Sequence, residues 1–234
     1  MKKIIFLISI IYAANSYCIT TDKVKVIVSE NSNTAELTLK SSSEDSYNLV
    51  KTQIQNKCGD LSENFIITPP LVQTFPGSET VLRIFSVNVK NLPQNKESRQ
   101  TIIINSTPAL KKSEQQNESN ANLKYHINKK IKMYLVFRPS GISTNKSPEI
   151  LSKRVTLEAL ANKIRVTNNS PFFIDVTNIN VKKTPLFKGG KILLSLKPFS
   201  SGTLNASMPK REKAFLTIID DFGASETLPA ITAQ

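Results

Sequence analysis

An alternation of apolar and polar residues between positions 122 and 138 is the sequence feature that most constrains the fold. The even positions from 124 to 132 carry lysine, histidine or asparagine. The odd apolar positions are Leu123, Tyr125, Ile127, Ile131, Met133, Leu135 and Phe137. Successive side chains of a strand point to opposite faces, so this pattern predicts one long β-strand with an apolar face. One small domain cannot easily cover so long a face, and an uncovered strand is a site for pairing with another chain.

The same two-residue period recurs along the chain and predicts an all-β fold. Apolar residues alternate at 24–28 and around Val81, and turn clusters rich in serine, asparagine, proline and glycine separate such runs. A second series of apolar runs begins near Ile150. Helical periodicity occurs at most at 155–160, and the sequence has no glycine-rich strand-to-helix turn. We therefore predict two β-sandwiches in tandem and no doubly wound nucleotide-binding fold.

The N-terminal segment predicts export. Residues 1–18 begin with a lysine pair, continue with an apolar run and end in small or polar residues, which is the composition of a signal peptide. Cleavage after Ser16 keeps Cys18 in the product, where acylation would make a lipoprotein, and cleavage after Cys18 removes it. No later hydrophobic run reaches membrane-spanning length, so we expect no membrane insertion.

Two polar segments divide the rest of the chain. Residues 107–122 lose nearly all apolar character after Leu110 and predict a mobile loop. Residues 142–148 predict a short linker. The expected domains are therefore 19–141 and 149–234, each of a size that can bury a core.

Composition argues against catalysis and against nucleic-acid binding. The only histidine, His126, lies in the long alternating segment without a partner motif, and the chain has only two cysteines. These residues supply no general base and no zinc site, so we expect no enzyme activity, no metal and no cofactor. The net charge is +13, but the charges are scattered and form no dense basic tract beside aromatic residues. We predict a cationic surface that steers anionic partners and no nucleic-acid partner.

Five motifs, in order, resemble those of the periplasmic pilus chaperones, which work with an outer-membrane usher. They cover almost the whole exported chain: Thr-Pro-Pro-Leu at 68–71 with Pro-Gly at 76–77 and Leu-Arg-Ile at 82–84; Leu-Pro-Gln-Asn-Lys-Glu-Ser at 92–98; Ile-Lys-Met at 131–133 leading to Phe-Arg-Pro at 137–139; Asn-Asn-Ser-Pro-Phe-Phe at 168–173; and Asp-Asp-Phe-Gly at 220–223. The resemblance implies a boomerang of two immunoglobulin-like domains that binds fimbrial subunits in the periplasm and delivers them to the usher.

In this family the long strand is lent to subunits that lack one strand of their own sandwich. The resemblance implies that residues 122–138 are the donor strand and that Leu123, Tyr125 and Ile127 fill the groove of the subunit. Three or four such buried side chains, at roughly 1.5–3 kcal/mol each, can sustain a tight complex. An exposed apolar strand can also drive self-capping dimers of the unloaded chaperone.

The resemblance also implies two charged sites. Lys25 and Lys132 are expected to anchor the terminal carboxylate of the subunit, although the family usually has arginine at the position of Lys25, and Lys23 is the alternative. Lys132 precedes Arg138 by two residues more than the family pattern. Three further positions match an interdomain salt-bridged trio, namely Glu97, Arg138 and Asp221.

Two rival functions are distinguishable from a chaperone. A secreted immunoglobulin-like structural or adhesive fibre protein would carry its donor segment at the N-terminus, whereas the alternating segment here is internal. A basic binder of polysaccharide or nucleic acid would bind polyanions in a salt-sensitive manner.

Overall fold

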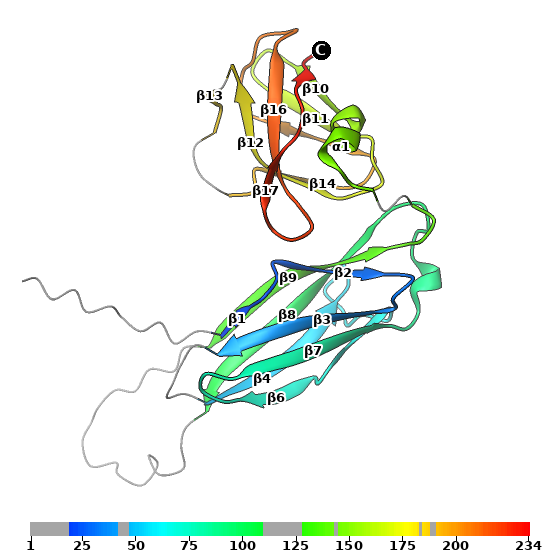
Figure 1. Ribbon diagram of the computed structural model, residues 1–234, viewed down its shortest axis with the longest axis vertical. Helices are drawn as coiled ribbons and strands as arrows, with labels where there is room; N and C mark the ends of the chain where they lie inside the picture. Colours follow the sequence, from blue (N-terminus) through cyan, green and yellow to red (C-terminus); the bar gives the residue numbers. More distant parts are fainter. Residues whose placement is uncertain (1–18, 42–46, 110–127, 143–144, 183, 188–190) are drawn as a thin grey trace, which may run out of the picture.

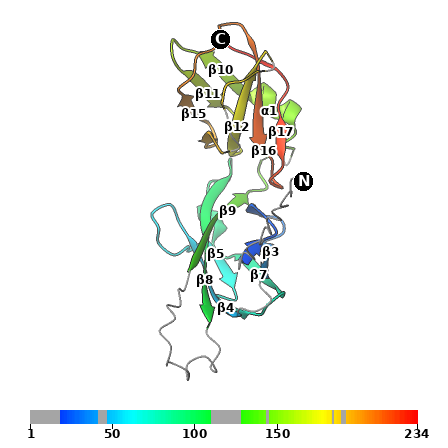
Figure 2. The same ribbon diagram turned by 90° about the vertical axis from the view of Figure 1, so that its left-hand side faces the viewer.

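The protein consists of two β-sandwiches, each with its own hydrophobic core (Figure 1). The computed structural model describes residues 19–41, 47–109, 128–142, 145–182, 184–187 and 191–234. Figure 2 shows the two sandwiches one above the other, with β9 of the first pointing toward the second. Within the described ranges, no helix is long and apolar enough to cross a membrane.

The N-terminal sandwich contains a four-stranded and a five-stranded sheet. The first has the order β1-β3-β7-β5, with bounds Ile19–Thr21, Thr34–Ser41, Glu79–Ser86 and Phe65–Thr68. The second has the order β2-β9-β8-β4-β6, with bounds Lys25–Ser29, Lys129–Arg138, Ser98–Ala109, Tyr47–Gln55 and Leu71–Thr74. A 3₁₀ turn, η1, spans Val89–Asn91. The pairings between the described strands of this sandwich are antiparallel except that of β2 with β9, which is parallel.

The core of this sandwich follows from strand alternation. Leu37 and Leu39 of β3 and Leu82 and Ile84 of β7 are buried together with inward residues of the other sheet. The apolar alternation expected around Val81 does not mark the inner face of β7, because Val81 is exposed whereas Leu82 and Ile84 are buried. β7 is apolar at both parities, so alternation alone could not decide its inner face.

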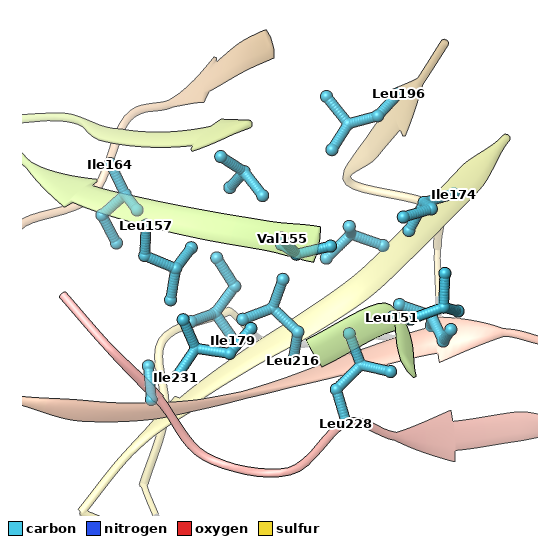
Figure 3. Close-up of a cluster of buried hydrophobic side chains, with 14 of the residues drawn as sticks. Leu151, Val155, Leu157, Ile164, Ile174, Ile179, Leu196, Leu216, Leu228 and Ile231 are labelled. Carbon is cyan, nitrogen blue, oxygen red and sulfur yellow. The ribbon is translucent and has the colours of Figure 1, made fainter. Parts of the chain in front are cut away.

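The C-terminal sandwich also has two sheets, whose buried side chains interdigitate in Figure 3. A three-stranded sheet has the order β10-β11-β15, with bounds Val155–Ala159, Ile164–Asn168 and Ser200–Leu204. The other has the order β13-β12-β16-β17, with bounds Thr184–Pro185, Ile174–Val181, Lys213–Ile219 and Ser225–Thr227. β14 (Leu194–Leu196) pairs with β12, and β18 (Ile231–Thr232) pairs with β16.

Two expectations about local structure are corrected. The segment 155–160 does not form a helix, since Val155–Ala159 is strand β10 with alternate residues buried. The described helix, α1, is Pro148–Arg154, which begins with proline, carries an acid in its first turn and ends in basic residues, as the helix dipole favours. The polar loop expected from residue 107 also begins later, because β8 continues to Ala109 and pairs there with β4.

Candidate functional site

Strand β9 is paired unevenly on its two sides. β8 pairs with it from Lys129 to Phe137, whereas β2 pairs only with its second half, from Tyr134 to Arg138. Among the described strands, none pairs with residues 130–133 on the β2 side. Backbone N–H and C=O groups on such an open edge can form hydrogen bonds with a strand of another chain.

The described part of β9 has the parity that the alternation predicts. Met133, Leu135 and Phe137 are buried in the core of the N-terminal sandwich, and Ile131 packs against that core. Leu123, Tyr125 and Ile127 lie outside the described residues, so their role as groove residues stays a prediction. The open edge at 130–133 directly follows that segment in the sequence.

The structure places Lys25 and Lys132 on the same face of the five-stranded sheet. Lys25 of β2 lies opposite Tyr134, and Lys132 lies two residues earlier on β9, about 7 Å away along the strand direction. Lys132 is exposed, whereas Lys25 is only 9% exposed and its Nζ lies 3.3 Å from Oδ1 of Asp221. Lys23, the alternative to Lys25, donates instead to the carbonyl oxygen of Glu36 at 2.7 Å.

Glu97, Arg138 and Asp221 are in direct contact at the junction of the two sandwiches. Arg138 donates to Oε1 of Glu97 through Nε at 2.9 Å and Nη2 at 2.6 Å, and Nη2 also donates to Oδ2 of Asp221 at 2.6 Å. The other carboxylate oxygen of Glu97 accepts the backbone N–H of Phe173 at 2.8 Å. The carboxylate of Glu97 therefore joins β9 to the C-terminal sandwich through two partners.

Lys146 is a member of this charge cluster that the motif comparison did not select. Its Nζ donates to Oδ1 of Asp221 at 2.8 Å, beside the contact from Lys25. Burial by itself would raise the pKa of Asp221, but Lys146 and then Arg138 outweigh burial and lower the pKa below its ordinary value of 3.8. Burial and the nearby Lys146 lower the pKa of Lys25, and Asp221 opposes that shift. Only its linker position at 142–148 could have pointed to Lys146.

The loop that carries Asp221 packs tightly against the N-terminal sandwich. Gly223 has a left-handed φ of 92°, and a Cβ at this position would lie 2.5 Å from Cγ2 of Val24. Asp220 Oδ1 accepts the backbone N–H groups of Phe222 at 2.9 Å and Ala224 at 2.7 Å, which holds the turn. The Asp-Asp-Phe-Gly sequence therefore serves both the turn and the interdomain contact.

The Asn-Asn-Ser-Pro-Phe-Phe motif is organised by a buried asparagine. Asn168 donates through Nδ2 to the carbonyl oxygens of Phe172 at 2.8 Å and Lys197 at 3.0 Å, and its Oδ1 accepts the N–H of Ser170 at 2.9 Å. This network satisfies polar groups that would otherwise be buried without partners. It also fixes the turn from which Phe173 donates its N–H to the carboxylate of Glu97.

A second interdomain contact, centred on Arg99, was not anticipated. Its Nη1 donates to Oγ of Ser195 at 2.9 Å, and its Nη2 lies 3.4 Å from Oδ1 of Asp175. The guanidinium carbon also lies 4.1 Å from the ring centre of Tyr134 and 3.9 Å from that of Phe173. Cation–π contacts of this kind contribute about 0.5–2 kcal/mol. Nothing in the sequence spacing links β8 to β12 and β14, so only the folded chain brings these groups together.

The described residues include no group of histidine, cysteine, aspartate and glutamate that could hold a metal ion. Cys58 is an exposed free thiol in the turn after β4. His126 lies outside the described residues.

These features are those of a two-domain immunoglobulin-like protein. It has an ion-paired junction between its domains, formed by Glu97, Arg138 and Asp221 and here called the hinge, and one strand edge that can pair with a further strand. Two family models match the chain: "Pili and flagellar-assembly chaperone, PapD N-terminal domain" over residues 18–143 and "Pili assembly chaperone PapD, C-terminal domain" over residues 151–230. The chain belongs to the family of pilus-assembly chaperones. Members of this family are fimbrial chaperones, a periplasmic and non-enzymatic class that works with fimbrial subunits and an usher.

Individual relatives agree with this assignment. The chain is 30% identical over 226 residues to the chaperone protein LpfB of Salmonella typhimurium, covering 94% of this chain and 91% of that protein. It is 25% identical over 202 residues to the chaperone protein FimC of Escherichia coli, covering 86% and 78%. The fold matches the SafB chaperone structure, solved with the SafA pilin of Salmonella enterica, with a TM-score of 0.75 and 21% identity over 94% of this chain and 98% of that chain. These matches do not favour a secreted adhesive fibre protein.

Proposed function

We propose that this chain is a periplasmic chaperone that lends a strand to pilus subunits and delivers them to an outer-membrane usher. The observation that carries the proposal is the open edge of β9 at 130–133, within a chain of the pilus-chaperone family. The alternating segment before it supplies side chains for the groove of the subunit, with Leu123, Tyr125 and Ile127 in this role. Hydrogen bonds between backbones set the register, and the alternate side chains supply most of the binding energy.

The carboxylate anchor is proposed to consist of Lys132 assisted by Lys25. Lys132 is exposed on the outward face of β9 and makes no ion pair with a described residue, so its charge is available. Lys25 is already paired with Asp221, which makes it less available to a subunit carboxylate. Lys132 is therefore the stronger contributor.

The remaining parts of the proposal concern export and the hinge. Residues 1–18 act as a signal peptide that is cleaved before the chain works in the periplasm, and N-terminal sequencing of the secreted product tests this. The domains are proposed to be 19–141 and 149–234, joined at 142–148. The trio of Glu97, Arg138 and Asp221 sets the angle between them, as expected of charges in a partly desolvated interface. The chain performs no catalysis in this role and needs no cofactor.

Co-expression with fimbrial subunits from the same organism tests the binding function. The wild type is expected to yield a soluble complex of one chaperone and one subunit, which Ile127→Asp and Lys132→Ala both weaken. Ile192→Asp and Lys163→Ala, at exposed positions of the C-terminal sandwich, are the matched controls and should bind as the wild type does. Failure of any subunit to co-purify, or equal binding by all variants, would remove the strand-donation proposal.

A further inference from the structure

The two sheets of the N-terminal sandwich differ in how their charges are balanced. The outward face of the four-stranded sheet neutralises itself, since Arg83 pairs with Glu36 at 3.2 Å and Lys40 pairs with Glu79 at 2.7 Å. The strands of the five-stranded sheet, by contrast, contain lysine and arginine but no aspartate or glutamate. Its outward face therefore has no carboxylate of its own strands to balance its cations.

The cations at the centre of this sheet form a compact group, which we call the cationic face, consisting of Lys51, Lys130 and Lys132. Lys51 of β4 and Lys130 of β9 both lie opposite Asn105 of β8. Lys51, Asn105 and Lys130 therefore form one row across the sheet. Strand spacing places the two lysines of this row about 10 Å apart, and Lys132 about 7 Å further along β9. No ion pair joins any of the three lysines to another described residue. These separations are close to the Debye length of about 8 Å at physiological salt, so their fields add.

The surroundings of these lysines favour a protein as the partner. Leu49 and Leu71 are exposed on the same outward face, and Leu71 lies directly opposite Lys51. Ile103 lies opposite Lys132 with the same parity but is buried, so Leu49 and Leu71 are the apolar side chains that this face exposes. Exposed apolar side chains beside well-separated charges are compatible with a protein interface, whereas polyanion sites use denser basic tracts.

We infer that the cationic face is a docking surface for an acidic face of the pilus subunit, which steers the subunit onto the open edge of β9. This inference rests on the proposed function and adds to it the chemical class of the subunit surface. Complementary charge mainly raises the association rate, by a factor of about 10 to 1,000 in favourable cases, and salt suppresses the effect. Subunits without an acidic face would be captured more slowly.

The test measures capture rates and leaves the proposed anchor Lys132 intact. A subunit that co-purifies with the wild type is released in urea and diluted into the chaperone variants at low and high sodium chloride. Lys51→Glu combined with Lys130→Glu is expected to slow capture about tenfold at low salt, with a difference that vanishes at high salt. Lys163→Glu combined with Lys210→Glu imposes the same change of net charge at exposed positions of the C-terminal sandwich and should alter the rate less than about twofold.

Three outcomes would overturn the inference. Equal slowing of capture by the two double variants would show that only net charge matters, and wild-type rates in both would show that steering is absent. Binding of the same variants to heparin is measured in parallel. If Lys51→Glu combined with Lys130→Glu abolishes heparin binding but leaves subunit capture unchanged, the cationic face is assigned to polyanions. If the wild type captures subunits and the variants do so equally well, the inference fails while the proposed function stands. Absence of capture by the wild type would remove the proposed function together with it.

Discussion

Replacement of Arg138 by alanine should destabilise this protein far more than replacement of an exposed arginine. In the wild type, Oε1 of Glu97 accepts two hydrogen bonds, and both come from Arg138. The side chain of Glu97 is only 1% exposed. The substitution therefore leaves a buried carboxylate with one remaining partner, the N–H of Phe173. Asp221 is less affected, since its ion pairs with Lys146 and Lys25 remain.

The magnitude follows from the asymmetry of buried ion pairs. Removing one member of such a pair costs about 3–5 kcal/mol because the other charge stays buried without compensation. For a chain of this length, 1 kcal/mol shifts the melting temperature by about 2–4 °C, so Arg138→Ala should lower it by about 6–20 °C. Arg165 pairs with Glu158 at 2.6 Å but is 45% exposed, so Arg165→Ala should cost less than about 1 kcal/mol.

Thermal and urea denaturation followed by circular dichroism measure these differences. A second variant, Arg138→Met combined with Glu97→Gln, removes both charges and should recover most of the stability that Arg138→Ala loses. The reasoning is refuted if Arg138→Ala costs no more than Arg165→Ala, or if the double variant is less stable than the single one.

Three other predictions concern the interface between the sandwiches. The pKa of Asp221 is lowered on folding, so its contribution to stability is complete above its ordinary value of 3.8 and declines as the pH falls toward its folded pKa. Asp221→Asn should therefore show a flatter loss of stability in acid titrations below about pH 4, and an unchanged acid profile would contradict this. Gly223→Ala should lower the free energy of unfolding by about 1–3 kcal/mol in denaturation experiments, because it combines a left-handed φ with a clash against Val24. Adding Val24→Ala to this variant should restore only the part of the stability that the clash removes. Arg99→Ala should widen the distribution of interdomain distances measured by pulsed electron spin resonance between labels on the two sandwiches, whereas Arg165→Ala should not, and equal distributions would show that the contact with Phe173 does not restrain the hinge.

The fold class was predictable because strand alternation is local. Side chains at i and i+2 share a face whatever the rest of the chain does, so the inward parity of Met133, Leu135 and Phe137 follows from their spacing alone. The same rule could not orient β7, where both parities are apolar and the packing of the opposite sheet selects Leu82 and Ile84. The helix at Pro148–Arg154 was missed because a short helix has little periodicity and depends on its terminal residues.

The features of the candidate site likewise fall into those that were predictable from neighbouring residues and those that depend on tertiary packing. The sequence by itself determined the apolar alternation before β9, the turn residues around Asp221 and the family motifs, because each of these is a relation between neighbours in the chain. Only the tertiary structure decided that Lys25 is engaged with Asp221, that Lys146 joins the hinge, and that Arg99 lies against Phe173. These contacts depend on distances between segments far apart in the sequence, and such distances are set by how the two sandwiches pack.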